Sequence, residues 1–340
     1  MTAPDGPSAD RSRGRLRALT ATASLVGGAA ILASKLVAWR LTGSHAVLSD
    51  ALESIVNVVA AVFALSAVRF ASQPADRDHP YGHGKMEYVS AAFEGGLIAF
   101  AAMAIIYDAV RTLWLGAELR SVDLGLAVTA AAGAANLLLG AFVLRTGRRL
   151  ESPTLVADGQ HILADVWTTV AVLSGLGLVR LTGLPILDPL AALFVGFYLA
   201  WTGYSLARGA TDALLDRDDP VLLAKLVAVF NKAQRPGLVG VHRLRVLRHG
   251  SLVHVDGHIH VAEHWTVRQA HDAAQELEGL VRAETGLEAE LALHLDPCRC
   301  EPCPECALEP CAARRLPFDG HRPVTVEEAA GPPRKPAASQ

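Results

Sequence analysis

Two sets of three polar side chains recur at the same spacing within apolar parts of the sequence. The sets are Asp50, Glu53, Asn57 and Asp158, His161, Asp165. A spacing of three and then four residues places each set on one face of a helix. Imidazole and carboxylate groups are ligands that suit Zn²⁺ and neighbouring first-row metals. We therefore predict that one i, i+4 pair from each helix forms a metal site with the ligands Glu53, Asn57, His161 and Asp165.

Hydrogen bonding between membrane helices is a simpler use of the same side chains. An ionisable group at the centre of a membrane span costs about 2.5 to 3.5 kcal/mol on insertion scales, so several together are expensive unless they hold a cation. This cost favours a metal site for the four ligands and leaves both interpretations open for Asp50 and Asp158. Other polar residues in or near spans show no such pattern and are expected to be bundle or interface residues: Lys35, Glu94, Asp108, Asp123 and Asn136.

Six apolar stretches are long enough to carry these side chains across a bilayer, which takes about 20 residues each. They cover residues 18–39, 45–68, 89–115, 122–144, 154–178 and 186–206. The chain is 51% hydrophobic and only 19% charged, a composition that favours a membrane protein over a soluble domain. Basic residues gather in the N-terminal arm and in alternate loops, so we predict a multi-pass protein of the plasma or inner membrane with both termini in the cytoplasm. The net charge of −3 does not indicate a nucleic-acid partner.

The two polar sets belong to a longer internal repeat. Residues 44–58 and 152–166 align without a gap, and they lie in spans two and five, an offset of three spans. The two copies must therefore cross the membrane in opposite directions, with their polar residues at comparable depth. Inverted repeats around a polar site near the midplane are typical of secondary transporters. The sequence thus predicts an α-helical membrane domain of six helices, built as an inverted three-helix repeat.

The sequence after the last span predicts a small α+β domain. Helices are expected over residues 220–233 and 266–284, with strands over 238–247, 253–259 and 287–295. This αββαβ order is typical of an open α+β sandwich. We predict four segments: a cytoplasmic arm over 1–17, the membrane domain over 18–210, a cytoplasmic α+β domain over 211–297 and a tail over 298–340.

The tail is rich in Pro, Glu and Cys, and we expect it to be disordered. Its C-x-x-C spacing also fits a site for a thiophilic metal. The candidate ligands there are Cys298, Cys300, Cys303 and Cys306. Both interpretations stay open.

A loop between the second and third spans has a second candidate site. Its sequence, QPADRDHPYGHGK from Gln73 to Lys85, contains two histidines and two aspartates among Pro and Gly residues. Turns at such residues can gather the four side chains around one metal. A solvated polar loop is the alternative.

The six spans, the four-residue pair in span two, the pair His161-x-x-x-Asp165 and the loop QPADRDHPYGHGK together resemble the cation diffusion facilitator family, over about residues 15–297. The resemblance implies a homodimeric antiporter that exports Zn²⁺ or a related ion in exchange for protons, with a ferredoxin-like cytoplasmic domain. It implies a loop site of Asp76, His79 and His83, and a cytoplasmic site of His242, His258, His271, His294 and Asp296. It also implies that Lys85 and Asp216 form a charge pair that steadies the dimer. Each of four further histidines of this domain is either a ligand or a surface residue: His249, His254, His260 and His264.

Span two departs from the pattern of the family's zinc exporters, which present Asp or His and then Asp. Glu53 and Asn57 stand in those positions, so the site has one carboxylate fewer. The preference among Zn²⁺, Fe²⁺, Co²⁺, Mn²⁺ and Cd²⁺ therefore stays open.

Two other classes of function fit the residues less well. An intramembrane metallohydrolase would need an HExxH-like pair or a nucleophile beside the metal ligands, and neither accompanies them, so we expect no enzyme. A membrane metal sensor or storage protein without transport would not need an inverted repeat.

Overall fold

The structure is a computed structural model that describes residues 7–42, 45–115, 123–249, 252–286, 288–298, 303–311, 314 and 316–332. The chain divides into two compact units, Met1–Leu215 and Asp216–Gln340.

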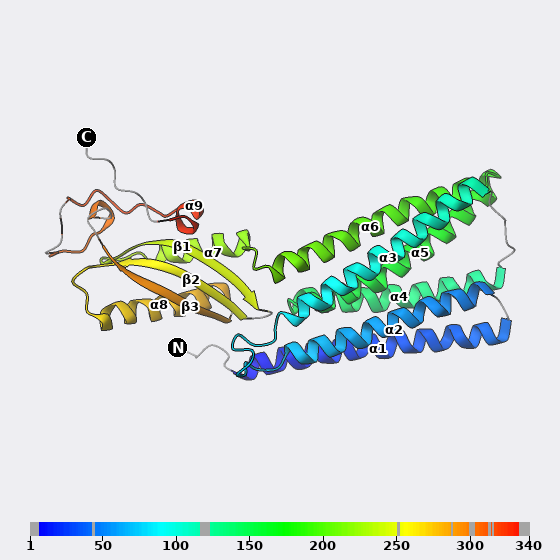
Figure 1. Ribbon diagram of the computed structural model, residues 1–340, viewed down its shortest axis with the longest axis horizontal. Helices are drawn as coiled ribbons and strands as arrows, with labels where there is room; N and C mark the ends of the chain where they lie inside the picture. Colours follow the sequence, from blue (N-terminus) through cyan, green and yellow to red (C-terminus); the bar gives the residue numbers. More distant parts are fainter. Residues whose placement is uncertain are drawn as a thin grey trace. The chain divides into compact units, whose positions relative to one another are not determined.

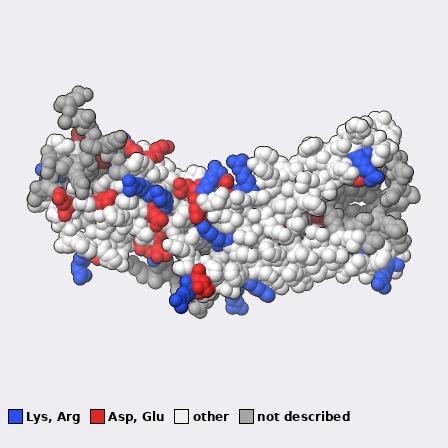
Figure 2. All heavy atoms as spheres, viewed as in Figure 1, with Lys and Arg blue, Asp and Glu red and all other residues white. Residues whose placement is uncertain are grey.

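The first unit is a bundle of helices (Figure 1). Among the described residues, six helices are long and apolar enough to cross a membrane. They are α1 (Pro7–Thr42), α2 (His45–Ala71), α3 (Met86–Leu115), α4 (Asp123–Arg149), α5 (Pro153–Thr182) and α6 (Leu187–Leu214). Figure 2 shows the visible surface of this unit almost free of charge between the Lys and Arg side chains at its two ends. The predicted six-helix membrane domain is confirmed.

Helix α5 lies at the centre of this unit, where it contacts α2, α3, α4 and α6. A buried polar network fixes its first turn. Arg17 of α1 donates from Nη1 to Glu87 Oε1 of α3 at 3.0 Å, and from Nη2 to the carbonyl of Leu150 at 2.6 Å. Ser152, the N-cap of α5, donates to the other carboxylate oxygen of Glu87. The buried ion pair thus has the additional hydrogen bonds that burial requires, and these contacts set the depth of His161, about two turns further along α5.

The second unit is an α+β domain. Its described strands form one sheet in the order β1-β2-β3. β1 (Leu238–His249) pairs antiparallel with β2 (Leu252–Val261), which pairs parallel with β3 (Glu288–Pro297). The helices α7 (Pro220–Ala233) and α8 (Val267–Thr285) contact each other, and they pack on β1 and β3 respectively. Their apolar faces bury Leu226, Phe230 and Leu277 in one core with the strands. The predicted αββαβ domain is confirmed.

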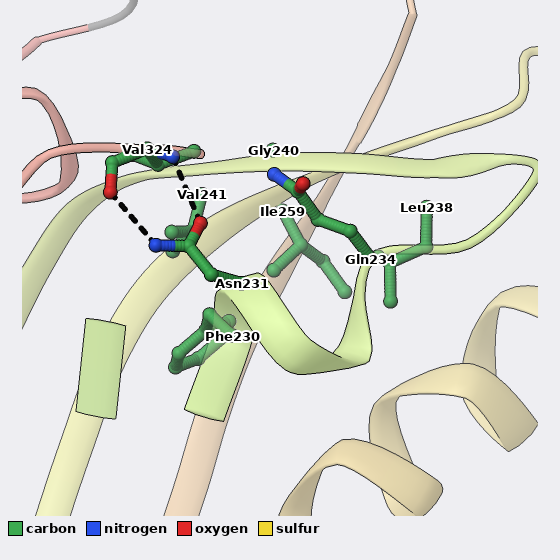
Figure 3. A pocket seen from close by; sticks show the side chains of 8 residues that line it. All are labelled: Phe230, Asn231, Gln234, Leu238, Gly240, Val241, Ile259 and Val324. Carbon is green, nitrogen blue, oxygen red and sulfur yellow. Dashed lines mark hydrogen bonds between the residues drawn. The ribbon is translucent and has the colours of Figure 1, made fainter. Parts of the chain in front are cut away.

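Part of the tail packs on this second unit. Val324 and Ala329 belong to its core, and α9 (Val326–Ala330) contacts β1 and α7. Asn231 of α7 donates to the carbonyl of Val324 at 2.9 Å and accepts from its N–H at 2.8 Å (Figure 3). A small cavity lies beside these bonds, lined partly by Phe230 and Ile259. The structure therefore differs from the expectation of disorder over residues 316–332, because this segment contributes apolar side chains to a core that its composition does not reveal.

Helices α3 and α6 approach each other closely through glycine. A Cβ added at Gly95 would lie 2.7 Å from the backbone nitrogen of Ala207 and 2.9 Å from the carbonyl oxygen of Gly203. One added at Gly96, the next residue of α3, would meet nothing within 4 Å. Small residues at a crossing let membrane helices pack backbone to backbone.

We expect Gly95→Ala to push α3 away from α6 and to lower the melting temperature of the purified protein in detergent by several degrees. Gly96→Ala is the matched control. It should leave the melting temperature unchanged or slightly higher, because Ala is a better helix former than Gly by about 1 kcal/mol. Equal effects of the two substitutions would contradict the close contact at Gly95.

Candidate metal sites

Helices α2 and α5 bring the two polar sets of the repeat together. Asn57 Oδ1 lies 3.0 Å from His161 Nε2, and Asn57 Nδ2 donates to Asp165 Oδ2. Asn57 and Asp165 are 108 residues apart and occupy equivalent positions of the two copies. The two antiparallel copies of the repeat therefore contact each other through equivalent residues.

Three of the four predicted membrane ligands thus form one hydrogen-bonded group. His161 is buried, with 6% of its surface exposed, and Asn57 and Asp165 are partly buried. The fourth, Glu53, lies one turn before Asn57 on α2, and its side chain is outside the described part of the structure. Lys35 of α1 is also buried, and its Nζ donates to Ser54 Oγ at 2.7 Å.

The hydrogen bonds of this group assign the tautomer of His161. A carboxylate only accepts, so the amide nitrogen of Asn57 must face Asp165 and its oxygen must face His161. Nε2 of His161 then carries the proton, and Nδ1 keeps a lone pair. That Nδ1 has no hydrogen-bond partner in the described structure, and it lies 3.8 Å from Glu94 Oε2 of α3.

Glu94 is the residue that the sequence pattern missed. Its position on α3 belongs to no repeated polar spacing in the sequence, so no pattern marks it as a ligand. Its complete burial is visible only in the folded bundle. Asp158, whose role the sequence left open, is also buried.

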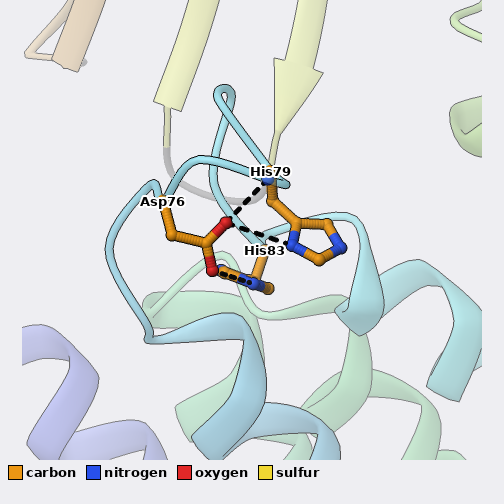
Figure 4. A group of neighbouring side chains, drawn as sticks. All are labelled: Asp76, His79 and His83. Atoms are coloured by element: carbon orange, nitrogen blue, oxygen red, sulfur yellow. Dashed lines mark hydrogen bonds and ion pairs between the residues drawn. The ribbon is translucent and has the colours of Figure 1, made fainter.

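The loop residues Asp76, His79 and His83 come together before α3 (Figure 4). Asp76 Oδ1 lies 3.3 Å from His79 Nδ1, and Asp76 Oδ2 lies 3.5 Å from His83 Nε2. The three offer ligand atoms within 4.8 Å of one another. His83 is buried against Phe70, with ring centroids 4.6 Å apart, so its ring is held in place. A hydrogen bond from the backbone N–H of His79 lowers the pKa of Asp76, which favours the ionised form that binds metal.

A row of side chains crosses the sheet of the second unit. His242 of β1 is paired with His258 of β2, which is paired with His294 of β3. Asp296 joins them: its carboxylate oxygens lie 3.2 Å from His242 Nε2, 3.0 Å from His258 Nδ1 and 2.7 Å from His294 Nδ1. His260 lies opposite Asp296 and stacks on His242, with ring centroids 4.7 Å apart. Two overlapping groups of three possible ligands result, and they share Asp296.

Successive side chains of a strand point to opposite faces of the sheet, and this alternation explains which histidines lie together. Val255 and Ile259 of β2 face the helices and the core, so His258 and His260 face the other side of the sheet. His271 lies on α8, the helix that packs on the core face of the sheet, and its own side chain is exposed to solvent. Among the described residues, it joins neither group of three.

The remaining histidines of this domain lie elsewhere. His249 and His254 face each other with ring centroids 5.0 Å apart, and His254 Nδ1 lies 3.3 Å from Glu290. His264 is exposed in the turn after β2.

The predicted tail site lies only partly within the described residues, and the two residues of the predicted charge pair belong to different units. Cys298 and Cys306 are buried, while Cys300 and the side chain of Cys303 lie outside the described residues. No cysteine belongs to a group of three possible metal ligands in the described part of the chain. Lys85 ends the loop before α3 in the first unit, and Asp216 begins the second unit with a φ of 57°.

The surroundings of Asp296 favour metal-binding protonation states. Burial, helped by neighbouring His260, lowers the pKa of His242 to about 4. Partial burial would raise the pKa of Asp296, but hydrogen bonds from His258 and His294 bring it below its ordinary value. Metal ligands must be deprotonated, so a neutral His242 and an ionised Asp296 are ready to bind an ion at neutral pH.

Known proteins resemble both units. The model of the cation efflux transmembrane domain matches residues 21–215, and that of the cation efflux protein cytoplasmic domain matches residues 219–298. An uncharacterized transporter of Synechocystis sp., sll1263, is 39% identical over 83% of this chain and 91% of its own length. The cation-efflux pump FieF of Salmonella paratyphi A is 29% identical over 86% of this chain and 97% of its own. FieF of Klebsiella pneumoniae is 30% identical over 85% and 95%.

The burial of His242 predicts a pH dependence of stability. Between its ordinary pKa of 6.5 and about 4, the unfolded chain binds a proton at this residue that the folded chain does not. The stability is therefore fully present above pH 6.5 and is lost as the pH falls toward 4. We expect the melting temperature of residues 216–340 in chelator, followed by circular dichroism, to fall between pH 7 and pH 5.

This fall should be smaller in His242→Gln. His264→Gln, which changes an exposed histidine of the same domain, is the control and should follow the native protein. A fall of the same size in His242→Gln and the native protein would show that His242 does not cause it.

Proposed function

The chain belongs to the cation diffusion facilitator (cation efflux) family, and on that premise we propose that it exports divalent transition-metal ions from the cytoplasm in exchange for protons. The observation that carries this proposal is the partly buried contact of Asn57, His161 and Asp165 between two antiparallel helices of the repeat. Such a contact at the meeting point of an inverted repeat is where secondary transporters bind their substrate. The related FieF is a cation-efflux pump, which supports the same direction of transport.

The proposed substrate is Zn²⁺ or a related ion among Fe²⁺, Co²⁺, Mn²⁺ and Cd²⁺. His161 offers an imidazole nitrogen, Asp165 a carboxylate and Asn57 an amide oxygen, and we propose Glu53 as the fourth ligand. Nitrogen with carboxylate and carbonyl oxygen suits these ions, although ligand type only biases the choice among them. Glu53 and Asp165 together balance the charge of one divalent ion.

Proton exchange follows from the chemistry of the ligands. An ion binds only to deprotonated imidazole and carboxylate groups, so protons and metal compete for the same atoms. The amide of Asn57 likewise competes with an ion for Asp165 Oδ2, which accepts the hydrogen bond of the amide in this structure. In this proposal, exposure of the site to one side and then the other lets metal replace protons in the cytoplasm and protons replace metal outside.

We propose two further metal sites, both on the cytoplasmic side. One is the loop site of Asp76, His79 and His83. The other is the histidine row of the cytoplasmic domain, where His242, His258, His294 and His260 surround Asp296. Their mixture of imidazole nitrogens and carboxylate oxygens fits Zn²⁺ and similar ions.

The same proposal places both termini in the cytoplasm and two copies in the working transporter. Arg148 and Arg149 end α4, and the positive-inside rule supports placing this end of the helix in the cytoplasm. The match to the family's cytoplasmic domain supports a homodimer. Lys85 and Asp216 are our proposed charge pair at its membrane edge.

We expect liposomes that contain the purified protein to take up one of the five ions when a pH gradient is imposed, and to stop when a protonophore collapses the gradient. Asp165→Ala should lose this uptake because it removes a carboxylate of the site. Asp188→Ala is the control: it removes a half-buried carboxylate at the start of α6, outside the group, and should transport normally.

Undiminished uptake in Asp165→Ala would contradict the proposed site. Tight binding without uptake of any ion would instead favour a membrane metal sensor or storage protein.

A further inference from the structure

Three ionisable side chains lie deep in the helical unit beside the Asn57–Asp165 contact. Glu94 of α3 is 0% exposed, and Asp158 and His161 of α5 are 1% and 6% exposed. Both carboxyl oxygens of Glu94, Oδ2 of Asp158 and Nδ1 of His161 have no hydrogen-bond partner among the described residues. Hydrogen bonds within the described fold therefore do not explain why the carboxyl group of Glu94 is buried.

Glu87 provides a comparison on the same helix. It is also buried, at 1% exposed, but both of its carboxyl oxygens are bonded, one to Arg17 and one to Ser152. Burying a polar group without a partner costs several kcal/mol, and more for a charge. Glu87 thus has the environment of a structural carboxylate, whereas Glu94 has that of a group that binds something else.

The facing atoms of Glu94 and His161 suit a cation. Because His161 carries its proton on Nε2, its Nδ1 and the carboxylate of Glu94 are both electron-pair donors, and they face each other at 3.8 Å. Two electron-pair donors without a proton between them do not form a hydrogen bond with each other. Two ligands of one ion, each bonded at about 2.0 to 2.2 Å, lie roughly 3 to 4 Å apart. Asp158, which is also buried, lies one turn before His161 on the same face of α5 and adds a further carboxyl group.

We infer that the ion-binding site extends beyond α2 and α5 to α3, where Glu94 and Nδ1 of His161 bind the transported divalent ion. This inference rests on the proposed transport function. The site then regains, from α3, the carboxylate that Asn57 does not provide on α2. Glu94 acts here as a ligand of the ion, whereas Glu87 only positions α1, α3 and α5.

Glu94→Gln tests this role because it keeps the shape and removes the charge. With Zn²⁺ as the probe, we expect the KM for uptake into liposomes under a pH gradient to rise at least about tenfold, which corresponds to roughly 1.4 kcal/mol of binding. The melting temperature in chelator should not fall, because a buried charge without a partner has been removed. The rise in melting temperature that Zn²⁺ causes should be smaller than in the native protein.

Glu87→Gln is the matched control on α3. It leaves Arg17 without its charged partner, so its melting temperature in chelator should fall while the KM of the folded fraction stays near the native value. If Glu94→Gln does not fold, Glu94→Asp takes its place. Its carboxylate is one methylene shorter, and the KM should again rise.

A native KM in whichever of these Glu94 variants folds would overturn the inference and leave the proposed function intact. Absence of uptake by the native protein would overturn the proposed function. In that case the Zn²⁺-induced rise in melting temperature still decides about Glu94, and an equal rise in native protein and variant would overturn its role as a ligand.

Discussion

The cost of placing ionisable side chains inside a membrane bundle governs this structure. Each such group costs about 2.5 to 3.5 kcal/mol at the centre of a span unless it is paired, and α2, α3 and α5 contain several. The structure treats them in two ways. Arg17, Glu87 and Ser152 satisfy one another and hold three helices together. His161 and Glu94 keep unpartnered atoms that face each other. This difference distinguishes Glu87, which holds the bundle together, from Glu94, which we propose as a ligand of the ion.

The rest of the fold supports that group. The repeat brings the equivalent residues Asn57 and Asp165 into contact, and the close approach of α3 and α6 at Gly95 keeps α3 packed near α5. The cytoplasmic domain uses strand alternation for a similar purpose. Its apolar side chains face α7 and α8, while the residues between them form a row of imidazoles around Asp296 on the opposite face.

Local patterns predict much of this protein. Hydropathy locates six spans, the repeated spacing identifies Asn57, His161 and Asp165, and the predicted helix over 220–233 has the bounds of α7. Features that depend on tertiary packing do not follow from spacing. Glu94 shows its role only beside His161. His260 lies in the row because it faces away from the core, whereas His271 is an exposed residue of α8, the helix that packs on the core face of the sheet. The tail has a disordered composition, yet Val324 reaches the core through its bonds to Asn231.

The most direct test of the membrane site is the Zn²⁺ dependence of the melting temperature of Asn57→Asp. The substitution replaces the amide donor of Asp165 with a second carboxylate, so the two should repel. We expect the variant to melt below the native protein in chelator and to gain more than the native protein when Zn²⁺ is added, because an ion bridges the two carboxylates. If Zn²⁺ did not restore the stability that the variant loses, this prediction would be contradicted. It would mean that Asn57, His161 and Asp165 only hydrogen-bond α2 to α5.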